Sequence, residues 1–224
     1  MQEIINLKNV SKFYQTDTVK TVALNEINMS VNEGDFISIS GASGCGKSTL
    51  LSIIGLLDDS SSGDMFIKGI NTSELSFDQK SIIRNNHLGM IFQSFNLLES
   101  ETVFGNVALP LVYRGVKKAK IKERVEKAVN DVGLSHRILH NPKQLSGGQQ
   151  QRVAIARALV GEPDVILADE ATGNLDSKSS QEIMALLGNL NQAGKTICYV
   201  THEKHFADLA EQKFTIVDGR ISKV

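Results

Sequence analysis

Short apolar runs and stretches of helical periodicity alternate along most of the chain. Apolar runs of strand length, each bounded by polar or turn-forming residues, predict strands at 4–10, 22–31, 36–40, 64–69, 87–93, 164–168, 196–200 and 214–217. Apolar residues that recur every three or four positions predict helices at 47–57, 119–132, 149–160 and 177–190. A polar loop at 15–20 separates the first two strands. The alternation favours an α/β fold, in which helices flank a mainly parallel sheet.

The middle of the chain departs from this alternation. The segment from about 94 to 158 contains two of the predicted helices, and one of them is strongly charged. A chain of 224 residues is long enough for one large domain, with or without an inserted subdomain. We therefore expect a single domain over residues 1–224, in which the helical block at about 94–158 is an insertion.

Composition and charge narrow the class of protein. Hydrophobic residues make up 41% of the chain and charged residues 22%, which is typical of a soluble globular protein. The formal net charge of −1 gives no overall basic field to attract nucleic acid or anionic lipid. No apolar run approaches the roughly 18 residues needed to cross a bilayer. The first residues lack the features of a secretory signal, and two cysteines, Cys45 and Cys198, fit a reducing cytosol.

A glycine-rich loop follows the strand at 36–40 and precedes the helix at 47–57. Its sequence fits G-x-x-x-x-G-K-[ST] and consists of Gly41, Ala42, Ser43, Gly44, Cys45, Gly46, Lys47, Ser48 and Thr49. Backbone N–H groups on such a turn, together with a helix N-terminus, form a positive site for phosphate. We expect Lys47 to reach the β- and γ-phosphates of a nucleotide and Ser48 to coordinate Mg²⁺. The small side chain of Cys45 needs no redox role to be tolerated there.

Two carboxylates stand at the end of the apolar strand at 164–168. Asp169 is placed to hold Mg²⁺, usually through water, and Glu170 is placed to orient and polarise an attacking water. Adjacent carboxylates at a strand end can also be plain surface residues. The phosphate loop elsewhere in the chain favours the catalytic interpretation.

A third motif resembles a known family. Leu145, Ser146, Gly147, Gly148 and Gln149, with the helix that follows, are similar to the signature region of the ATP-binding cassette (ABC) transporter ATPases. The resemblance covers essentially the whole chain. It implies a P-loop ATPase core with a mainly parallel sheet, an N-terminal antiparallel β-subdomain and an inserted α-helical subdomain. It also implies ATP and Mg²⁺ as ligands, and a head-to-tail homodimer in which Ser146, Gly147, Gly148 and Gln149 cap the γ-phosphate bound by the partner.

Four further residues take roles only from this resemblance. Asp176 is similar to the residue of a loop that crosses the dimer interface, although it could equally be a helix N-cap. Tyr14 resembles the aromatic residue that stacks on adenine. Gln93 resembles the glutamine that touches Mg²⁺ and senses the γ-phosphate. His202 resembles the switch histidine that contacts the γ-phosphate.

The chain departs from the family pattern after the carboxylate pair. Ala171 stands where the family usually has proline, which would push Glu170 toward extended geometry and remove one N–H. We expect activity to survive, because Glu170 itself is present. Ala42 also stands where proline is common, and we expect no effect there.

The segment 94–111 is unusually apolar for a stretch that follows a catalytic glutamine. It can be local core, or part of a groove that receives a helix from a membrane partner. Because Gln93 comes directly before it, a groove there would couple γ-phosphate contact to partner contact. The resemblance thus implies a separate integral-membrane permease that docks near Gln93 to Leu111, and a cassette that is cytoplasmic and peripheral on the inner face of the membrane.

The motifs at 92–98, 106–111 and 172–176 resemble the lipoprotein-release and macrolide-export subfamily, which includes antimicrobial-peptide resistance and cell-division members. This implies export or extraction of a lipoprotein, peptide or drug-like substrate. A signalling or cell-division role with a membrane partner stays open on these residues. ABC ATPases that act on DNA or ribosomes usually carry coiled coils, zinc-binding cysteines or two cassettes, so we expect no nucleic-acid partner. The signature region excludes a simple P-loop kinase.

Overall fold

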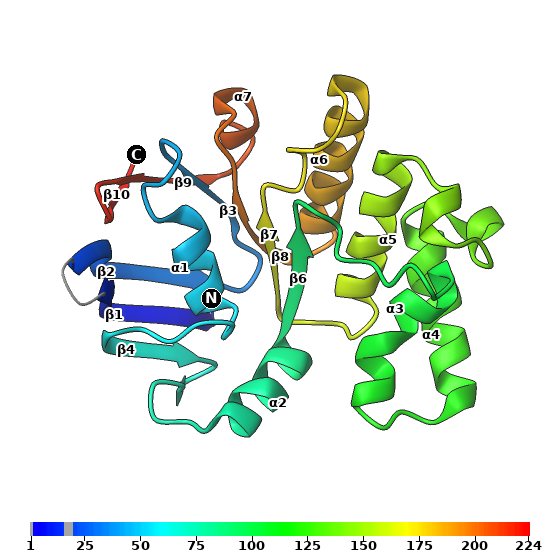
Figure 1. Cartoon of the computed structure of the whole chain (residues 1–224), viewed down its shortest axis with the longest axis horizontal. Helices are drawn as coiled ribbons and strands as arrows, with labels where there is room; N and C mark the ends of the chain where they lie inside the picture. Colours follow the sequence, from blue (N-terminus) through cyan, green and yellow to red (C-terminus); the bar gives the residue numbers. More distant parts are fainter. Residues whose placement is uncertain (1, 16–19) are drawn as a thin grey trace.

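The structure is a computed structural model that describes residues 2–15 and 20–224 (Figure 1). Its central sheet has six strands in the order β10-β9-β3-β8-β7-β6. Strands β9, β3, β8, β7 and β6 run parallel to one another, and β10 pairs antiparallel with β9. The strands are β3 (Phe36–Ser40), β6 (Leu88–Phe92), β7 (Val165–Asp169), β8 (Thr196–Val200), β9 (Gln212–Val217) and β10 (Arg220–Lys223). The predicted α/β fold with a mainly parallel sheet is therefore confirmed.

A second sheet of four strands lies beside the first (Figure 1). It is antiparallel throughout, in the order β2-β1-β4-β5. Its strands are β1 (Glu3–Gln15), β2 (Lys20–Asn32), β4 (Ser62–Ile67) and β5 (Ile70–Asn71). This is the N-terminal antiparallel subdomain that the family resemblance implied. The first two strands are longer than predicted, and residues 16–19 of the predicted polar loop lie outside the described residues.

The helices occupy the space between the sheets and the outer side of the central sheet (Figure 1). Helix α1 touches β2 as well as β7 and β8, so it fills the angle between the two sheets. The helices are α1 (Lys47–Ile54), α2 (Phe77–His87), α3 (Val103–Tyr113), α4 (Lys118–Asp131), α5 (Gly147–Leu159), α6 (Ser177–Gln192) and the short α7 (Lys204–Ala207), with 3₁₀ turns at Ser135–Arg137 and Pro142–Gln144. Helices α3, α4 and α5 pack on one another, within the predicted helical block. Its boundaries at 94 and 158 stay a prediction.

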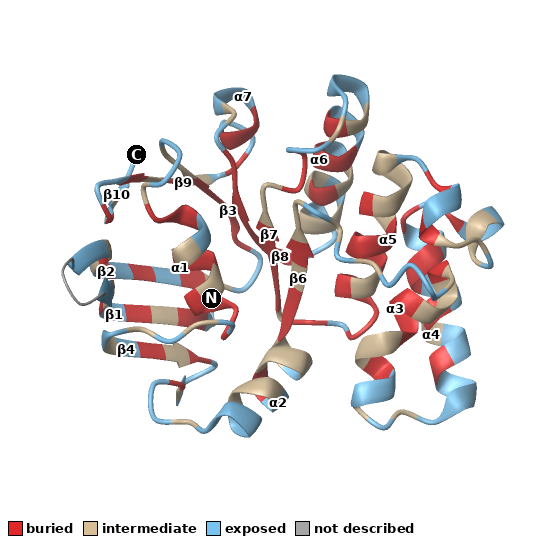
Figure 2. Ribbon diagram, in the orientation of Figure 1, coloured by how far each residue is buried: buried red, intermediate tan, exposed pale blue. Residues whose placement is uncertain are grey.

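Strands β3, β7 and β8 are buried along almost their whole length because both of their faces are covered (Figure 2). Their side chains divide between two cores. One core lies under the antiparallel sheet and around α1, and the other is shared with α3, α4, α5 and α6. Short, mostly apolar runs are typical of a doubly covered parallel strand, and this is why the sequence located these strands to within a residue.

Three helical features differ from the sequence prediction. Helix α1 ends at Ile54, because Gly55 follows as its C-cap, and Leu57 is left half exposed. Helix α2 was missed because only Ile83 on it is buried, so it shows little apolar periodicity. Helix α3 was missed because its apolar residues run continuously and include Pro110.

A buried asparagine holds the loop that leads into α3. Asn106 is fully buried, accepts a hydrogen bond from the Leu98 amide at 2.7 Å and donates to the Leu98 carbonyl at 3.0 Å. It also donates to the carbonyls of Glu101 and Thr102. Because a buried amide without partners is costly, this network fixes the loop against the helix.

One carboxylate joins three elements at the edge of the sheet where its parallel strands begin. Asp164, just before β7, binds the ammonium of Lys68 at 2.7 Å and the Nδ1 of His87 at 2.7 Å. Partial burial favours its neutral form, but the hydrogen bonds and charges of Lys68 and His87 outweigh burial and lower the pKa of Asp164. A carboxylate with a lowered folded pKa adds stability above its unfolded pKa, and that stability is lost as the pH falls through the folded pKa.

Replacement Asp164→Asn should therefore lower the free energy of unfolding at pH 7 by about 0.5–1 kcal/mol, as for a partly exposed ion pair. The loss should shrink as the pH falls toward 3, because the wild-type carboxyl becomes neutral as well. Thermal or urea unfolding at pH 7, 5 and 3 measures it. Asp131→Asn, an exposed carboxylate on α4, is the control. A difference that stayed constant down to pH 3 would contradict the charge-based account.

Candidate functional site

The glycine loop, residues 41–49, joins β3 to α1 and ends in the first turn of that helix. Gly46 caps α1 with a φ of 109°, in the left-handed region that side chains rarely adopt. A Cβ at Gly46 would also collide with the carbonyl oxygen of Ala23. Glycine is therefore required at position 46 for two reasons, the backbone conformation and the close contact with β2. The resulting turn points the N-terminus of α1 toward the glycine loop. This N-terminus carries a partial positive charge.

The lysine of the loop is buried although it is charged. Lys47 is 5% exposed, and its ammonium donates hydrogen bonds to the carbonyls of Gly41 at 2.9 Å and Ala42 at 2.8 Å. The sulfur of Cys45 lies 3.9 Å from the same nitrogen. A cation enclosed by its own loop, next to a helix N-terminus, fits the phosphate site that the sequence predicts for this turn.

Asp169 meets the glycine loop at the end of β7. The hydroxyl of Ser48 donates to Oδ1 of Asp169 at 3.1 Å, although the two residues are 121 positions apart. Burial raises the pKa of Asp169, and the charge of Glu170 adds to this, while the bond from Ser48 and the charge of Lys47 oppose it. A hydroxyl and a carboxylate are oxygen ligands of the kind that Mg²⁺ prefers, so this pair fits the ion that the sequence implied.

Glu170 and His202 come together beside this pair. Glu170 has a left-handed φ of 44°, its N–H donates to the Val200 carbonyl at 3.2 Å, and its Oε1 lies 3.4 Å from Nδ1 of His202. Ala171, the residue in place of proline, is buried in the core. The residue before a proline is restricted to extended geometry, so Ala171 leaves Glu170 free to adopt this turn.

Gln93 follows β6 and is tied to the loop that follows Glu170. Its Nε2 donates to Oδ1 of Asn174 at 3.4 Å, and Nδ2 of Asn174 donates to the Gln93 carbonyl at 3.1 Å. The approach depends on Gly173, where an added Cβ would lie 2.5 Å from Nε2 of Gln93. Asn174 belongs to the motif at 172–176, and its contact with Gln93 was not predicted.

The two residues that come soon after Gln93 have an unusual backbone. Phe95 and Asn96 both lie in the left-handed region, with φ of 59° and 50°. The guanidinium of Arg157 on α5 donates to both of their carbonyls, at 2.8 Å for Phe95 and 2.5 Å for Asn96. Burial lowers the pKa of Arg157. This arginine therefore holds residues 93–98, here called the glutamine loop, against α5, a role that its place in an amphipathic helix did not reveal.

The signature segment, residues 145–149, begins α5. Ser146 is the N-cap: its hydroxyl accepts from the Gln149 amide at 3.4 Å, and the Gln149 side chain accepts from the Ser146 amide at 3.0 Å. Gly147 and Gly148 form the first turn. The start of α5 and the glycine loop lie on opposite sides of the central strands in Figure 1. Within the chain, the glycine loop and the signature segment therefore do not lie side by side.

Asp176 caps the next helix, as one of its two predicted roles requires. Its side chain accepts hydrogen bonds from the amides of Lys178 and Ser179 at 3.1 and 3.0 Å and from the Ser179 hydroxyl at 2.6 Å. The hydrogen bonds of Ser179, from side chain and backbone, lower the pKa of Asp176. Its role at a dimer interface stays a prediction.

Tyr14 lies apart from the phosphate residues, near the end of β1. It is half exposed, its hydroxyl donates to Asp58 at 3.1 Å, and the ammonium of Lys12 lies 5.0 Å from the centre of its ring. Residues 16–19, which follow it, are outside the described part of the chain. Stacking of adenine on Tyr14 therefore stays a prediction.

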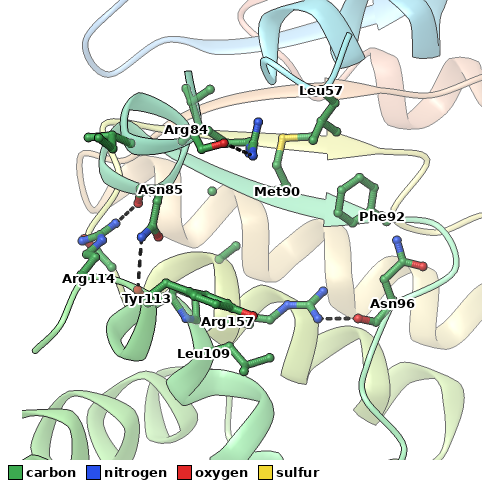
Figure 3. Close-up of a pocket in the computed structure, with 17 residues that line it drawn as sticks. Leu57, Arg84, Asn85, Met90, Phe92, Asn96, Leu109, Tyr113, Arg114 and Arg157 are labelled. Atoms are coloured by element: carbon green, nitrogen blue, oxygen red, sulfur yellow. Dashed lines mark hydrogen bonds between the residues drawn. The ribbon is translucent and has the colours of Figure 1, made fainter. Parts of the chain in front are cut away.

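A groove of about 660 Å³ opens between α2, β6 and α3 (Figure 3). Its labelled lining includes Met90 and Phe92 of β6, Leu109 and Tyr113 of α3, and Arg157. The amide of Asn85 on α2 donates to the Pro110 carbonyl at 3.4 Å and bridges the two walls. Part of α3 is buried in the core, as one interpretation of the apolar segment 94–111 requires, and part of it lines the groove. Docking of a partner helix in this groove stays a prediction. The contribution of α2 was not predicted.

Comparison with known proteins identifies similar sequences and structures. The profile of a family described as "ABC transporter" matches residues 24–173. The chain is 46% identical over 221 residues to an uncharacterized ABC transporter ATP-binding protein of Methanocaldococcus jannaschii, covering 99% of each. It is 47% identical over 220 residues to the macrolide export ATP-binding/permease protein MacB of Bartonella quintana, covering 98% of this chain but only 33% of that protein.

A solved structure is similar over almost the whole chain. It is the dimeric structure of a post-hydrolysis state of the ATP-binding cassette MJ0796 bound to ADP and Pi, with a TM-score of 0.89, 41% identity and 98% coverage of both chains. Because 98% of this chain is covered, the similarity includes both sheets and the helical block.

The clamp of Arg157 on the glutamine loop gives a local prediction. In Arg157→Lys a single ammonium replaces two directed donors, so amide hydrogen exchange at residues 93–98 should become about tenfold faster, as for the loss of one hydrogen bond. Arg152→Lys is the matched control, because Arg152 lies on the same helix but binds Glu182 and the Val132 carbonyl. Equal exchange in both variants would mean that Arg157 does not hold the loop.

Proposed function

Since the chain belongs to the ABC transporter family of ATP-binding proteins and is an ATPase, we propose that it hydrolyses MgATP between two copies arranged head to tail and drives a separate membrane permease. The observation that carries this proposal is the bond between Ser48 and Asp169, which joins the glycine loop to the carboxylate strand. It brings the phosphate-binding residues and the carboxylates into one site, as phosphoryl transfer to water requires.

Each residue of this site has a defined task in the proposed reaction. Lys47 and the amides of the glycine loop bind the β- and γ-phosphates of ATP. Ser48, Asp169 and Gln93 would hold Mg²⁺, which would neutralise phosphate charge. Glu170 orients the attacking water and takes up its proton, and His202 holds the Glu170 carboxylate and contacts the γ-phosphate.

A second copy completes the site. Ser146, Gly147, Gly148 and Gln149 of one copy are proposed to cap the γ-phosphate held by the glycine loop of the other, with the Asp176 loop crossing the interface. The separation of these two turns within one chain supports the pairing, because neither turn can complete the other within that chain. The dimeric ADP- and Pi-bound cassette MJ0796 supports it as well.

The groove between α2 and α3 is proposed to receive a helix of the permease. Its walls expose Ile82, Tyr113 and Leu57 to solvent, and an apolar helix would cover them. Arg157 lines this groove and holds the glutamine loop, so a helix seated there would press on the segment that carries Gln93. ATP binding and permease movement would be coupled through that contact.

The membrane partner is proposed to be a separate polypeptide. Within the ranges that the structure describes, no helix is long and apolar enough to cross a bilayer. A separate permease is supported by the Methanocaldococcus jannaschii relative, which is named an ATP-binding protein and is covered to 99% of its length. MacB relatives are named ATP-binding/permease proteins, and the chain spans one third of their length, which supports a permease as the partner. We also propose that the chain lies in the cytoplasm, peripheral on the inner face of the cell membrane, and that the exported or extracted substrate is of the lipoprotein, peptide or drug-like class.

Glu170→Gln should keep ATP affinity but lower turnover by roughly 10²–10⁴-fold, because the amide cannot accept the proton of the attacking water. It should accumulate an ATP-bound dimer, measurable by phosphate release and size-exclusion chromatography with light scattering. Glu203→Gln is the matched control, since Glu203 lies one residue from His202 but contacts Thr172. A Glu170→Gln protein that stays monomeric with saturating ATP would contradict the paired site.

Lys47→Ala should weaken ATP binding about 30-fold or more, because it removes a charge-assisted contact to phosphate oxygens. Titration with a fluorescent ATP analogue measures the affinity. The thermal unfolding of the variant should be recorded alongside, because Lys47 also binds two loop carbonyls. Undiminished affinity in a folded variant would show that the glycine loop is not the phosphate site.

A further inference from the structure

The turn between α3 and α4 concentrates positive charge. Five of the 24 lysine and arginine residues of the chain fall within residues 112–122, which hold none of its 25 acidic residues. The turn protrudes at the lower edge of the molecule in Figure 1, and Figure 2 shows it as exposed. The nearly neutral net charge of the chain hides this local excess.

Three lysines of this turn form no salt bridge with the carboxylates that the structure describes. Lys117, Lys118 and Lys120 are exposed, and no described carboxylate forms a salt bridge with them; Lys122 has only Glu126, at 3.9 Å. They also crowd the N-terminal end of α4, whose first turn contains no acidic residue. Positive charge at that end opposes the helix dipole. An external anion would relieve both effects.

Apolar side chains stand beside these lysines. Tyr113 is 80% exposed and Val112 is 56% exposed, at the end of α3. Arg114, by contrast, turns inward and donates to the carbonyls of Gly161 and Asn85. The side chains left at the surface are therefore a tyrosine, a valine and a set of lysines, the combination typical of segments that lie at the polar surface of a bilayer.

The position of the turn links it to the groove. Tyr113 and Arg114 line one end of the groove, so the turn borders any helix seated there. If that helix belongs to a membrane protein, the neighbouring surface of the cassette faces the bilayer. This step rests on the proposed function.

We propose that the α3–α4 turn binds the anionic headgroups of the bilayer that holds the permease, through Lys117, Lys118 and Lys120, with Tyr113 at the headgroup level. The attraction is short-ranged, because salt screens charges beyond roughly 10 Å, so it acts when the turn is close to the membrane surface. It therefore favours the orientation of the cassette in which the α3–α4 turn faces the bilayer.

Vesicle binding tests this proposal. The purified chain is mixed with vesicles of phosphatidylcholine alone or with an equal share of phosphatidylglycerol, and the bound fraction is measured by flotation at low salt. Each lysine near an anionic surface contributes about fivefold to the partition coefficient, so the triple replacement Lys117→Gln, Lys118→Gln and Lys120→Gln should lower binding to the anionic vesicles by about a hundredfold. High salt should have the same effect on the wild type.

A matched triple variant controls for total charge. Lys8, Lys204 and Lys223 are exposed lysines on β1, α7 and β10, and their replacement by Gln changes the net charge equally. This variant should bind like the wild type, and Tyr113→Ala should bind more weakly in both low and high salt. Basal ATP hydrolysis, measured in parallel, should be unchanged in both triple variants.

Three outcomes would overturn the proposal. The wild type could fail to prefer anionic vesicles, or the two triple variants could lose binding equally, or the turn could bind a single-stranded oligonucleotide and not the vesicles. If the wild type showed no ATP hydrolysis, the proposed function would be overturned instead. The two failures are distinguishable, because the vesicle assay needs no nucleotide.

Discussion

The parallel pairing of β3, β8, β7 and β6 is the constraint on which the site depends. Ile39 lies opposite Val200, and Asp169 lies opposite both Val200 and Phe92, so the four strands end at one edge of the sheet. Each strand then delivers one part of the site: the glycine loop after β3, His202 after β8, the carboxylate pair on and after β7, and Gln93 after β6. Residues from four distant parts of the sequence meet because parallel strands share a carboxyl edge.

A second level of organisation ties this edge to the helical block. Asn174 holds the side chain and carbonyl of Gln93, and Arg157 holds the two left-handed residues that come soon after it. Left-handed conformation in a bulky residue such as Phe95 is costly and persists only where surrounding contacts enforce it. The loop that carries Gln93 is thus defined from outside, by a neighbouring loop on one side and by α5 on the other. A change in the orientation of α5 would therefore be expected to move the glutamine loop, because these bonds join the two.

The core strands and the phosphate motifs could be predicted well, because each depends on residues that are adjacent in the sequence. Runs such as 36–40 and 196–200 are buried on both faces, and the glycine loop needs particular residue types at particular positions. What the sequence left out depends on distant partners. The buried residue of α2 is Ile83, so this helix has little apolar periodicity. The apolar residues of α3 form a continuous run that shows no helical periodicity. Arg157 and Asn174 act through backbone and amide contacts that no spacing rule reveals, and the interface role of Asp176 and the stacking role of Tyr14 stay predictions.

The enclosed ammonium of Lys47 has a consequence for nucleotide affinity. Two carbonyls of its own loop accept hydrogen bonds from this cation. Phosphate oxygens that bind it as proposed must compete with these internal ligands. The affinity of the loop for nucleotide therefore reflects an exchange of hydrogen bonds and not a simple gain.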